Sequence, residues 1–279
     1  MKFSSILILF STVVFYSCDK PVVLDLDQMP PRVVIEGLVS DQPNYQFVKV
    51  SRTVDFYEEG KTPRVSDAIV FVSDDLGNEF SFVHNPHNHA DSAGYYLPSV
   101  PFVGEPGRTY HLSVTVDGDL YEAEDKMYRI TEIDSLQYRI NEEEMDDPNE
   151  EGKFYELLLY AKEPQETSDY YLFKFFRNDS LKIDNPTAIY FADDKVLGEE
   201  INGVPSPVYY APGDSARVEM FSLSRVGYVF YSDLFNLLNN DGGMFSPPPA
   251  NSRTNLSKGA LGFFQVSAIT IAGIRIIEK

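Results

Sequence analysis

The sequence predicts a mainly β protein, in which an immunoglobulin-like β-sandwich is followed by a second antiparallel β domain that carries one amphipathic helix. Short segments of alternating apolar and polar residues recur at sandwich spacing through residues 32–126. A second series, rich in aromatic and β-branched residues, continues through residues 127–279 and contains the segment with helical spacing. Hydrophobic residues make up 43% of the 279 residues, which is ample for packed cores.

Residues 1–17 are predicted to form a signal peptide. Lys2 supplies a positive start, residues 6–16 form an apolar run, and Ser17 is a small residue at the expected cleavage position. A helix needs about 20 apolar residues to cross a bilayer, so this run is too short to span one.

Cys18 is the only cysteine of the chain and directly follows this segment. The arrangement resembles a bacterial lipoprotein signal, in which the thiol takes a diacylglycerol and the new amine takes a third acyl chain. Phe15 departs from the common pattern, which has Leu, Val or Ile at that position. Despite this departure, the position of the single cysteine predicts that Cys18 is lipidated and that residues 18–31 form an acylated tether. The alternative is an ordinary signal peptide with a cysteine near the cut by chance.

The charge of the chain excludes one class of partner. The sequence has 23 Lys and Arg against 43 Asp and Glu, a net charge of −20, and removal of residues 1–17 with Lys2 changes this to −21. Such a surface repels phosphate backbones, so we expect no nucleic-acid partner. It also repels anionic headgroups, so the lipid must hold the protein to the membrane.

The predicted sandwich has about seven strands. Its clearest part is the hairpin over residues 108–124, where Tyr110, Leu112 and Val114 share one face and Asp117-Gly118 form a two-residue turn. The other segments with strand patterns are RVVIEGLVS (32–40), YQFVKVSRTV (45–54), DAIVFVSDDLGNEFSFV (67–83, two strands) and GYYLPSV (94–100).

The second domain is predicted from further strand patterns and one helix. The strands are expected within residues 130–140, 154–163, 169–179, 187–194, 214–224, 259–270 and 273–278. The helix is expected near residues 224–239, packed on the second sheet, with Ser224 as its N-cap and Gly242 as its end. The acidic run over residues 141–153 is interpreted as a solvated loop.

Three of the four histidines, His84, His87 and His89, lie within six residues. Imidazoles at this spacing can converge on zinc or copper. Pro86 and two asparagines favour a solvated turn between two strands instead, so no metal site is assigned to them.

The acidic pairs offer a second metal hypothesis. Asp74-Asp75, Asp146-Asp147 and Asp193-Asp194 could contribute to loop calcium sites, although the EF-hand spacing is absent from all of them. No Gly-x-Ser-x-Gly, HExxH or phosphate-binding glycine loop occurs, so no catalytic residue and no cofactor are predicted and the chain is expected not to be an enzyme. The proline-containing segment over residues 242–264 is interpreted as a long loop that closes over the helix or a sheet end.

Several of these segments, taken in order, resemble a known family. The lipobox cysteine followed by LDLD, then RVVIEGLVSD, DAIVFVSDDLGN, GRTYHLSVTVDGDLYEAE and PPPANSRTNLSKGALGFFQVS, is similar to the Bacteroidota envelope lipoproteins grouped as domain of unknown function 4249. The resemblance implies an outer-membrane lipoprotein, commonly encoded beside a TonB-dependent transporter. It brings no catalytic residues with it.

A short pattern that resembles the acceptor motif for envelope O-glycosylation in Bacteroidota occurs four times. The four sites are Asp91-Ser92-Ala93, Asp134-Ser135-Leu136, Asp179-Ser180-Leu181 and Asp214-Ser215-Ala216. Coincidence in an acidic chain is the alternative, and Ser92 and Ser215 lie in the contexts that most resemble loops.

The leading functional hypothesis is a non-enzymatic accessory or ligand-binding lipoprotein associated with a TonB-dependent transporter. It would lie at the outer membrane, anchored through Cys18, on the cell surface or the periplasmic face, and its ligand is unknown. One alternative is an envelope hydrolase that acts on glycans or peptides. Another is a surface adhesion or structural module, for which immunoglobulin-like domains are common.

Overall fold

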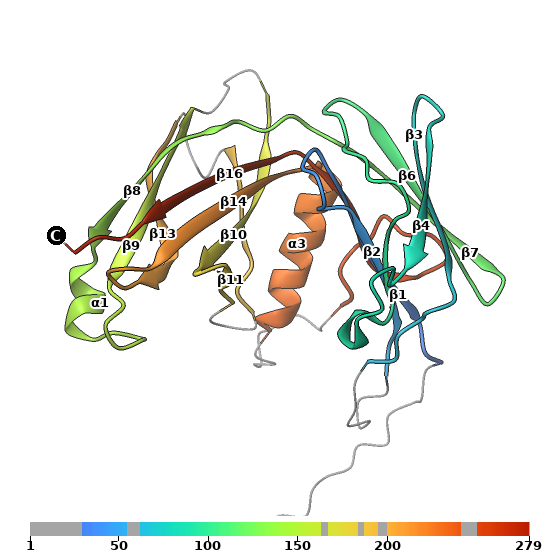
Figure 1. Cartoon of the computed structure of the whole chain (residues 1–279), viewed down its shortest axis with the longest axis horizontal. Helices are drawn as coiled ribbons and strands as arrows, with labels where there is room; N and C mark the ends of the chain where they lie inside the picture. The colour runs from blue at the N-terminus through green and yellow to red at the C-terminus, as the bar shows by residue number, and fades with distance from the viewer. Residues whose placement is uncertain are drawn as a thin grey trace, which may run out of the picture. The chain divides into compact units, whose positions relative to one another are not determined.

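A computed structural model (Figure 1) describes residues 30–54, 62–162, 167–183, 187–194, 200–240 and 250–278. Seven strands from the first half of the chain and one from near its end form a sheet of eight strands. The strand order is β15-β1-β2-β5-β4-β3-β6-β7. The strands are β1 (Val33–Ser40), β2 (Phe47–Arg52), β3 (Ile69–Asp74), β4 (Glu79–His84), β5 (Tyr95–Pro98), β6 (Thr109–Val116), β7 (Asp119–Lys126) and β15 (Leu261–Ser267). A single 3-10 turn, η1 (Ala90–Ser92), interrupts the connection between β4 and β5.

The sheet folds over one apolar core, as in a sandwich. All eight strands, β1 to β7 and β15, contribute buried residues to the same cluster. The side chains on the two inner faces alternate with outward-facing ones, as in Tyr110, Leu112, Val114 and Val116 of β6. The prediction of a mainly β fold with an immunoglobulin-like sandwich is confirmed.

The turn between β6 and β7 follows from its two residues. Asp117 and Gly118 both adopt positive φ, at 52° and 87°, which is the conformation of a type I′ turn. This turn matches the right-handed twist of the paired strands, and the register runs without a break from Val116↔Asp119 to Thr109↔Lys126. The hairpin is therefore specified locally, as predicted.

The second half forms another pair of sheets. A five-stranded sheet has the order β11-β10-β14-β16 with β12 paired to β10, and a three-stranded sheet has the order β13-β9-β8. All their pairings are antiparallel, and the two sheets share one buried cluster. Their strands are β8 (Ile133–Ile140), β9 (Tyr155–Lys162), β10 (Tyr170–Arg177), β11 (Ser180–Leu181), β12 (Tyr190–Asp193), β13 (Glu200–Tyr210), β14 (Ser215–Leu223) and β16 (Ile269–Arg275).

Part of the acidic run is helical, so its interpretation as a loop is wrong for these residues. Helix α1 (Glu142–Asp146) begins after Asn141, whose side chain accepts a hydrogen bond from the backbone N–H of Glu144 at 3.1 Å. The three glutamates of the first turn interact favourably with the positive end of the helix dipole. The cap and the acidic first turn together favour a helix of one turn.

Helix α3 (Arg225–Leu238) confirms the predicted helix. Ser224 caps it, because its side chain accepts from the Gly227 N–H at 3.0 Å. The helix ends at Leu238 with Asn239 as its C-cap, before the predicted end at Gly242, which is outside the described residues. It contacts β10, β12 and β14 of the second sheet and also β15 of the first (Figure 1).

One strand from late in the chain belongs to the first sheet. β15 pairs in parallel with β1 over seven register positions, from Val34↔Leu261 to Ser40↔Ser267. The next strand, β16, pairs with β14 in the second sheet, and residues 31–279 form one compact unit. The division into domains 32–126 and 127–279 stays a prediction, and β15 is the strand that reaches across that boundary.

A glycine makes this pairing sterically feasible. Gly262 has a φ of +95°, and a Cβ at this position would lie 2.1 Å from the Ile35 carbonyl oxygen. Any side chain would push β15 away from β1. Because β15 also contacts α3, the same glycine holds the helix in place.

We expect the Gly262→Ala substitution to lower the free energy of unfolding by about 2 to 5 kcal/mol, since it adds a backbone clash to a strained φ. Gly118→Ala is the control, because Gly118 has a similar positive φ but no atom within 4 Å of the added Cβ. The control should cost about 1 kcal/mol. Urea unfolding measures both, and equal losses would contradict the role given to Gly262.

Candidate ligand-binding cleft

A cleft of about 490 Å³ lies between α3 and the first sandwich. Its lining comes from α3, β1, β2, β10 and β15, together with Asn251 and Ser252. These elements are far apart in the sequence and meet here because β15 returns to β1. Clefts of this size between packed elements are the usual sites of small-molecule binding.

Most of the wall is apolar and aromatic. Phe230 of α3 stacks on Phe263 of β15, with ring centroids 4.9 Å apart and an interplanar angle of 22°. Leu234 and Leu237 extend the helical side, and Phe47 of β2 lies on the side of the sandwich. The wall can therefore pack against a flat apolar group.

A hydrogen-bonded chain fixes the polar part of this wall. The Tyr231 hydroxyl donates to Gln265 Oε1 at 2.6 Å, and Gln265 Nε2 donates to Ser267 Oγ at 2.8 Å. Ser267 Oγ in turn donates to the Ser222 carbonyl. Burial raises the pKa of Tyr231, so its hydroxyl stays protonated and keeps donating at physiological pH. The orientation of the Gln265 amide is thus determined on both sides.

Lys174 brings a positive charge to the cleft. It lies on β10 in phase with Leu172 and Phe176, on the sheet face that points away from the second core. Its Nζ is 4.5 Å from the centroid of the Phe221 ring. Within the described residues, no hydrogen bond or ion pair is formed by this ammonium group. Burial lowers the pKa of Lys174, and the nearby Glu219 partly offsets this effect.

Glu219 is the neighbouring acid, and its charge is already compensated. Its Oε1 accepts from the Tyr45 hydroxyl at 2.7 Å and also contacts Arg217 Nη1. Arg217 is held in place by stacking over the Phe176 ring, 3.8 Å from its centroid. Burial, and then the hydrogen bond to Glu219, raise the pKa of Tyr45 to about 12. Glu219 therefore pairs with Arg217 and Tyr45 rather than with Lys174.

The segment before β15 closes one side of the cleft. Arg253 forms a two-pronged ion pair with Asp233 of α3, with Nε–Oδ2 at 2.7 Å and Nη2–Oδ1 at 2.9 Å. This contact holds the adjacent Ser252 against the helix. The Ser252 Oγ is buried and has no hydrogen-bond partner among the described residues. It is a second polar group of the lining without a protein partner.

Asp125 positions the start of α3 relative to both sandwiches. Its carboxylate accepts from the Val266 N–H at 3.0 Å and from the hydroxyl of Ser224, the helix cap. Strand β7, strand β15 and the helix are thereby joined through one buried group. Burial raises the pKa of Asp125 from 3.8 to about 6, against the hydrogen bonds from Ser224, Val266 and Lys126 that favour the charged form.

A second hollow, of about 550 Å³, lies beside the junction of β15 and β16. Several polar groups of its lining are bonded to the protein. Asp41 accepts from the Ile269 N–H at 2.8 Å, Gln42 donates to the Ile269 carbonyl at 3.0 Å, and Arg129 donates to Thr167 at 2.6 Å. These contacts connect the two sandwiches, which gives this hollow a structural role.

None of the described residues that the sequence singled out as a candidate site belongs to the lining of the cleft. Cys18 lies outside the described residues. The Nε2 atom of His84 accepts a hydrogen bond from the Gly94 N–H at 2.9 Å, so one of its two ring nitrogens is occupied. The His84 ring also packs against Tyr96. His87 and His89 are exposed on the loop that follows β4. In the described part of the chain, no three His, Cys, Asp or Glu side chains are grouped so as to hold a metal.

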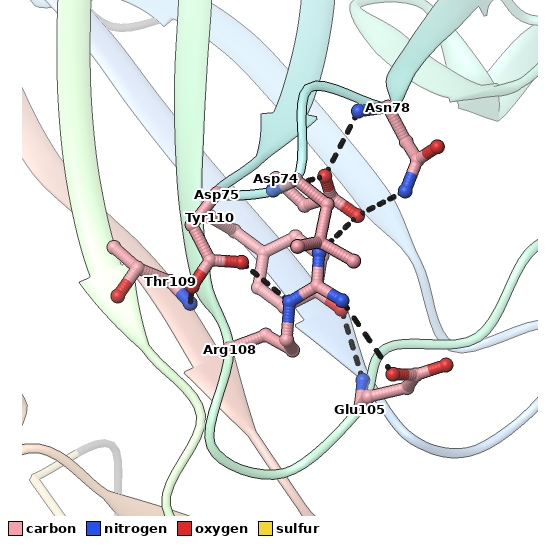
Figure 2. Close-up of polar contacts among 8 residues, drawn as sticks. Asp74, Asp75, Asn78, Glu105, Arg108, Thr109 and Tyr110 are labelled. Atoms are coloured by element: carbon pink, nitrogen blue, oxygen red, sulfur yellow. Dashed lines mark hydrogen bonds and ion pairs between the residues drawn. The ribbon is translucent and has the colours of Figure 1, made fainter.

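The carboxylates of Asp74 and Asp75 are bonded to protein groups (Figure 2). Arg108 Nη2 lies 2.7 Å from Asp74 Oδ2, and Arg108 Nε contacts Asp75. Asp74 also accepts from the Asn78 side chain at 2.7 Å and from two backbone N–H groups. Burial alone would raise the pKa of Asp74, but the bonds from Asn78, Leu76 and Arg108 outweigh it and lower the pKa. The network stabilises the β3–β4 turn.

The other acidic and serine motifs are dispersed. Asp146 ends α1 and Asp147 is its C-cap, whereas Asp193 ends β12. The serines of the four Asp-Ser motifs lie in η1 (Ser92), β8 (Ser135), β11 (Ser180) and at the start of β14 (Ser215), and the last three are exposed. Ser215 thus begins a strand, although its sequence context resembles a loop.

The cleft residues carried little signal in the sequence. Lys174 is the exception, because it stands in phase with Leu172 and Phe176 in a strand that is otherwise apolar and aromatic. Removing a cation from water costs free energy, so a lysine at such a position indicates a functional role. The predicted strand over residues 169–179 contains this lysine, but no sequence motif marks it as a site residue.

The chain is a β protein of two sandwiches with a cleft that α3 lines on one side. The chain belongs to the family described as Domain of unknown function (DUF4249), whose model matches residues 19–271. Among curated proteins, none matches the chain. In the part of the chain that the structure describes, none of the helices has the length and hydrophobicity required to cross a bilayer.

The role of Asp125 predicts a specific pH dependence. Because its folded pKa lies above its unfolded value, its contribution to stability is greatest at low pH and is lost as the pH rises from about 4 to about 6, by up to about 3 kcal/mol. In the Asp125→Asn variant this loss is absent, so the variant should gain stability relative to the wild type across that interval. Urea unfolding at several pH values measures the difference.

The Asp119→Asn variant is the matched control, since it removes one negative charge from an exposed position on the same strand. A difference between the wild type and Asp125→Asn that stays constant from pH 4 to pH 6 would contradict the burial of an ionisable group at this junction.

Proposed function

We propose that this protein is an outer-membrane lipoprotein, anchored through Cys18, that serves as a non-enzymatic ligand-binding accessory of a TonB-dependent transporter. The observation that carries the ligand-binding part is the cleft beside α3, whose wall is apolar and whose Lys174 ammonium has no partner among the described residues. The anchor rests on the short apolar run and the single cysteine after it.

The polar groups that line the cleft are held in fixed positions. The Tyr231 hydroxyl and the Gln265 amide belong to one hydrogen-bonded chain, and the acid nearest Lys174 is bonded to Arg217 and Tyr45. Groups held in this way can orient a ligand. The cleft therefore supports a protein that holds its ligand.

The acidic composition supports a lipid anchor. A chain with a net charge of −20 gains no electrostatic attraction to anionic headgroups, so acyl chains have to supply the membrane affinity. Association with a transporter is the part of the proposal that rests on the family resemblance, because envelope lipoproteins of this kind are commonly encoded beside one.

The anchor predicts that the Cys18→Ala variant moves from the outer-membrane fraction to the soluble envelope fraction. Loss of the acylated thiol removes the apolar contacts that hold the chain to the bilayer. Fractionation and mass spectrometry of the mature N-terminus measure this. Ser17→Ala, which keeps a small residue at the cleavage position, is the control and should stay in the membrane. An unmodified Cys18, or unchanged fractionation of Cys18→Ala, would contradict the anchor.

The partner is tested by affinity purification of the tagged chain from detergent-solubilised outer membranes. We expect enrichment of a TonB-dependent transporter over a control purification with an unrelated outer-membrane lipoprotein that carries the same tag. If no transporter is enriched over that control, the accessory role is wrong, even where the anchor is intact.

A further inference from the structure

The lining of the cleft contains one charge without an ion-pair partner in the part of the chain that the structure describes. Two charged side chains line it, Glu36 and Lys174. Glu36 is paired with Lys49, whose Nζ lies 2.7 Å from Glu36 Oε1. Lys174 Nζ has the Phe221 ring as its close neighbour but no anionic partner. Glu36 therefore has an ion-pair partner, whereas Lys174 has none among the described residues.

An acidic residue lies opposite Lys174 in the sheet but is bonded to other groups. Glu219 stands directly opposite Lys174 in the β10–β14 register, but its Oε1 is bonded to the Tyr45 hydroxyl and to Arg217. The Arg217 guanidinium lies over the Phe176 ring and shares the Glu219 carboxylate with Tyr45, so the charge of this acid compensates that of Lys174 only in part. A half-buried ammonium in this state is costly for the empty protein and is stabilised by an anion that enters the cleft.

The rest of the lining defines the body of the ligand. Phe230, Phe263 and Phe47 provide aromatic surfaces, and Leu234 adds an aliphatic one. Aromatic side chains pack favourably against flat rings. The Ser252 hydroxyl, buried without a partner among the described residues, is free to donate to an oxygen acceptor.

We propose that the cleft binds a small aromatic carboxylate, with the carboxylate held by Lys174 and the ring packed against Phe47 of β2 and Leu234 of α3. This inference rests on the proposed ligand-binding function and adds the chemical class of the ligand. A carboxylate fits because lysine binds it as a point charge, and a neutral hydroxyl in the same place would leave the ammonium unpaired.

The test uses 2-naphthoate and its neutral counterpart 2-naphthalenemethanol as probes for the full chain. The sequence contains no tryptophan, so naphthalene fluorescence can be excited beyond the tyrosine absorption and its anisotropy reports binding directly. We expect the wild type to bind naphthoate about 10- to 100-fold more tightly than the alcohol, which is the range of one charge-assisted hydrogen bond.

Three variants separate the charge from the apolar wall. Lys174→Met keeps the length of the side chain and should bind naphthoate no better than the alcohol. Leu234→Ala should weaken both probes by a similar factor, because it removes apolar contact only. Lys258→Met removes an exposed lysine that pairs with Asp119, away from the cleft, and should bind both probes like the wild type.

The proposal is overturned if the wild type shows no preference for naphthoate over the alcohol, or if Lys174→Met retains that preference while circular dichroism shows it to be folded. Should Lys174→Met fail to fold, pH-matched competition by benzoate and by benzamide against the naphthoate signal of the wild type decides instead, and equal competition refutes the role of the charge. Enrichment of a transporter in the affinity purification together with no preference for the anion leaves the accessory role standing and removes the ligand class alone.

Discussion

The parallel pairing of β15 with β1 is the contact on which the arrangement of the described chain depends. It brings residues 261–267 back to a strand that lies more than 220 positions earlier in the sequence. Parallel pairs need a long connection, and here that connection contains strands β2 to β14 and helix α3. The pairing requires that β15 approach β1 closely at Gly262, where the backbone adopts a conformation that residues with a Cβ avoid. Without this pairing, the cleft would lose the wall that Phe263 and Gln265 of β15 form.

Buried polar groups then fix the helix over this pairing. Asp125 joins β7, β15 and the cap of α3, while Tyr231 and Gln265 form the next link further along the helix. Each of these groups is hydrogen-bonded, and buried polar networks that are fully satisfied specify one arrangement of the surrounding elements. Asp233 and Arg253 add a third attachment at the surface. The cleft is therefore a preformed feature of the fold, which lowers the entropic cost of ligand binding.

Local patterns predicted what local forces determine. The β6–β7 hairpin follows from alternation and from the Asp117-Gly118 turn, and Ser224 marks the start of α3 as a capping residue should. Strand β13 was missed because Pro205 and Pro207 disfavour a central strand, yet β13 is an edge strand whose register shifts accommodate them. The partner of β15 was not predictable from local sequence, because a parallel pairing across such a separation leaves no short-range pattern. Since the cleft depends on that pairing, its lining was not predictable either.

The electrostatics of the molecule favour a holding function. A net charge of −20 repels an anionic ligand at a distance and slows its association, although salt screens this repulsion beyond about 8 Å. Once the ligand is inside the cleft, the attraction to Lys174 acts across a medium of lower permittivity and is correspondingly stronger. Because entry is slow and retention is strong, the affinity for the ligand is determined mainly by a low dissociation rate. Slow release of this kind fits the proposed role, in which the protein keeps its ligand close to a transporter.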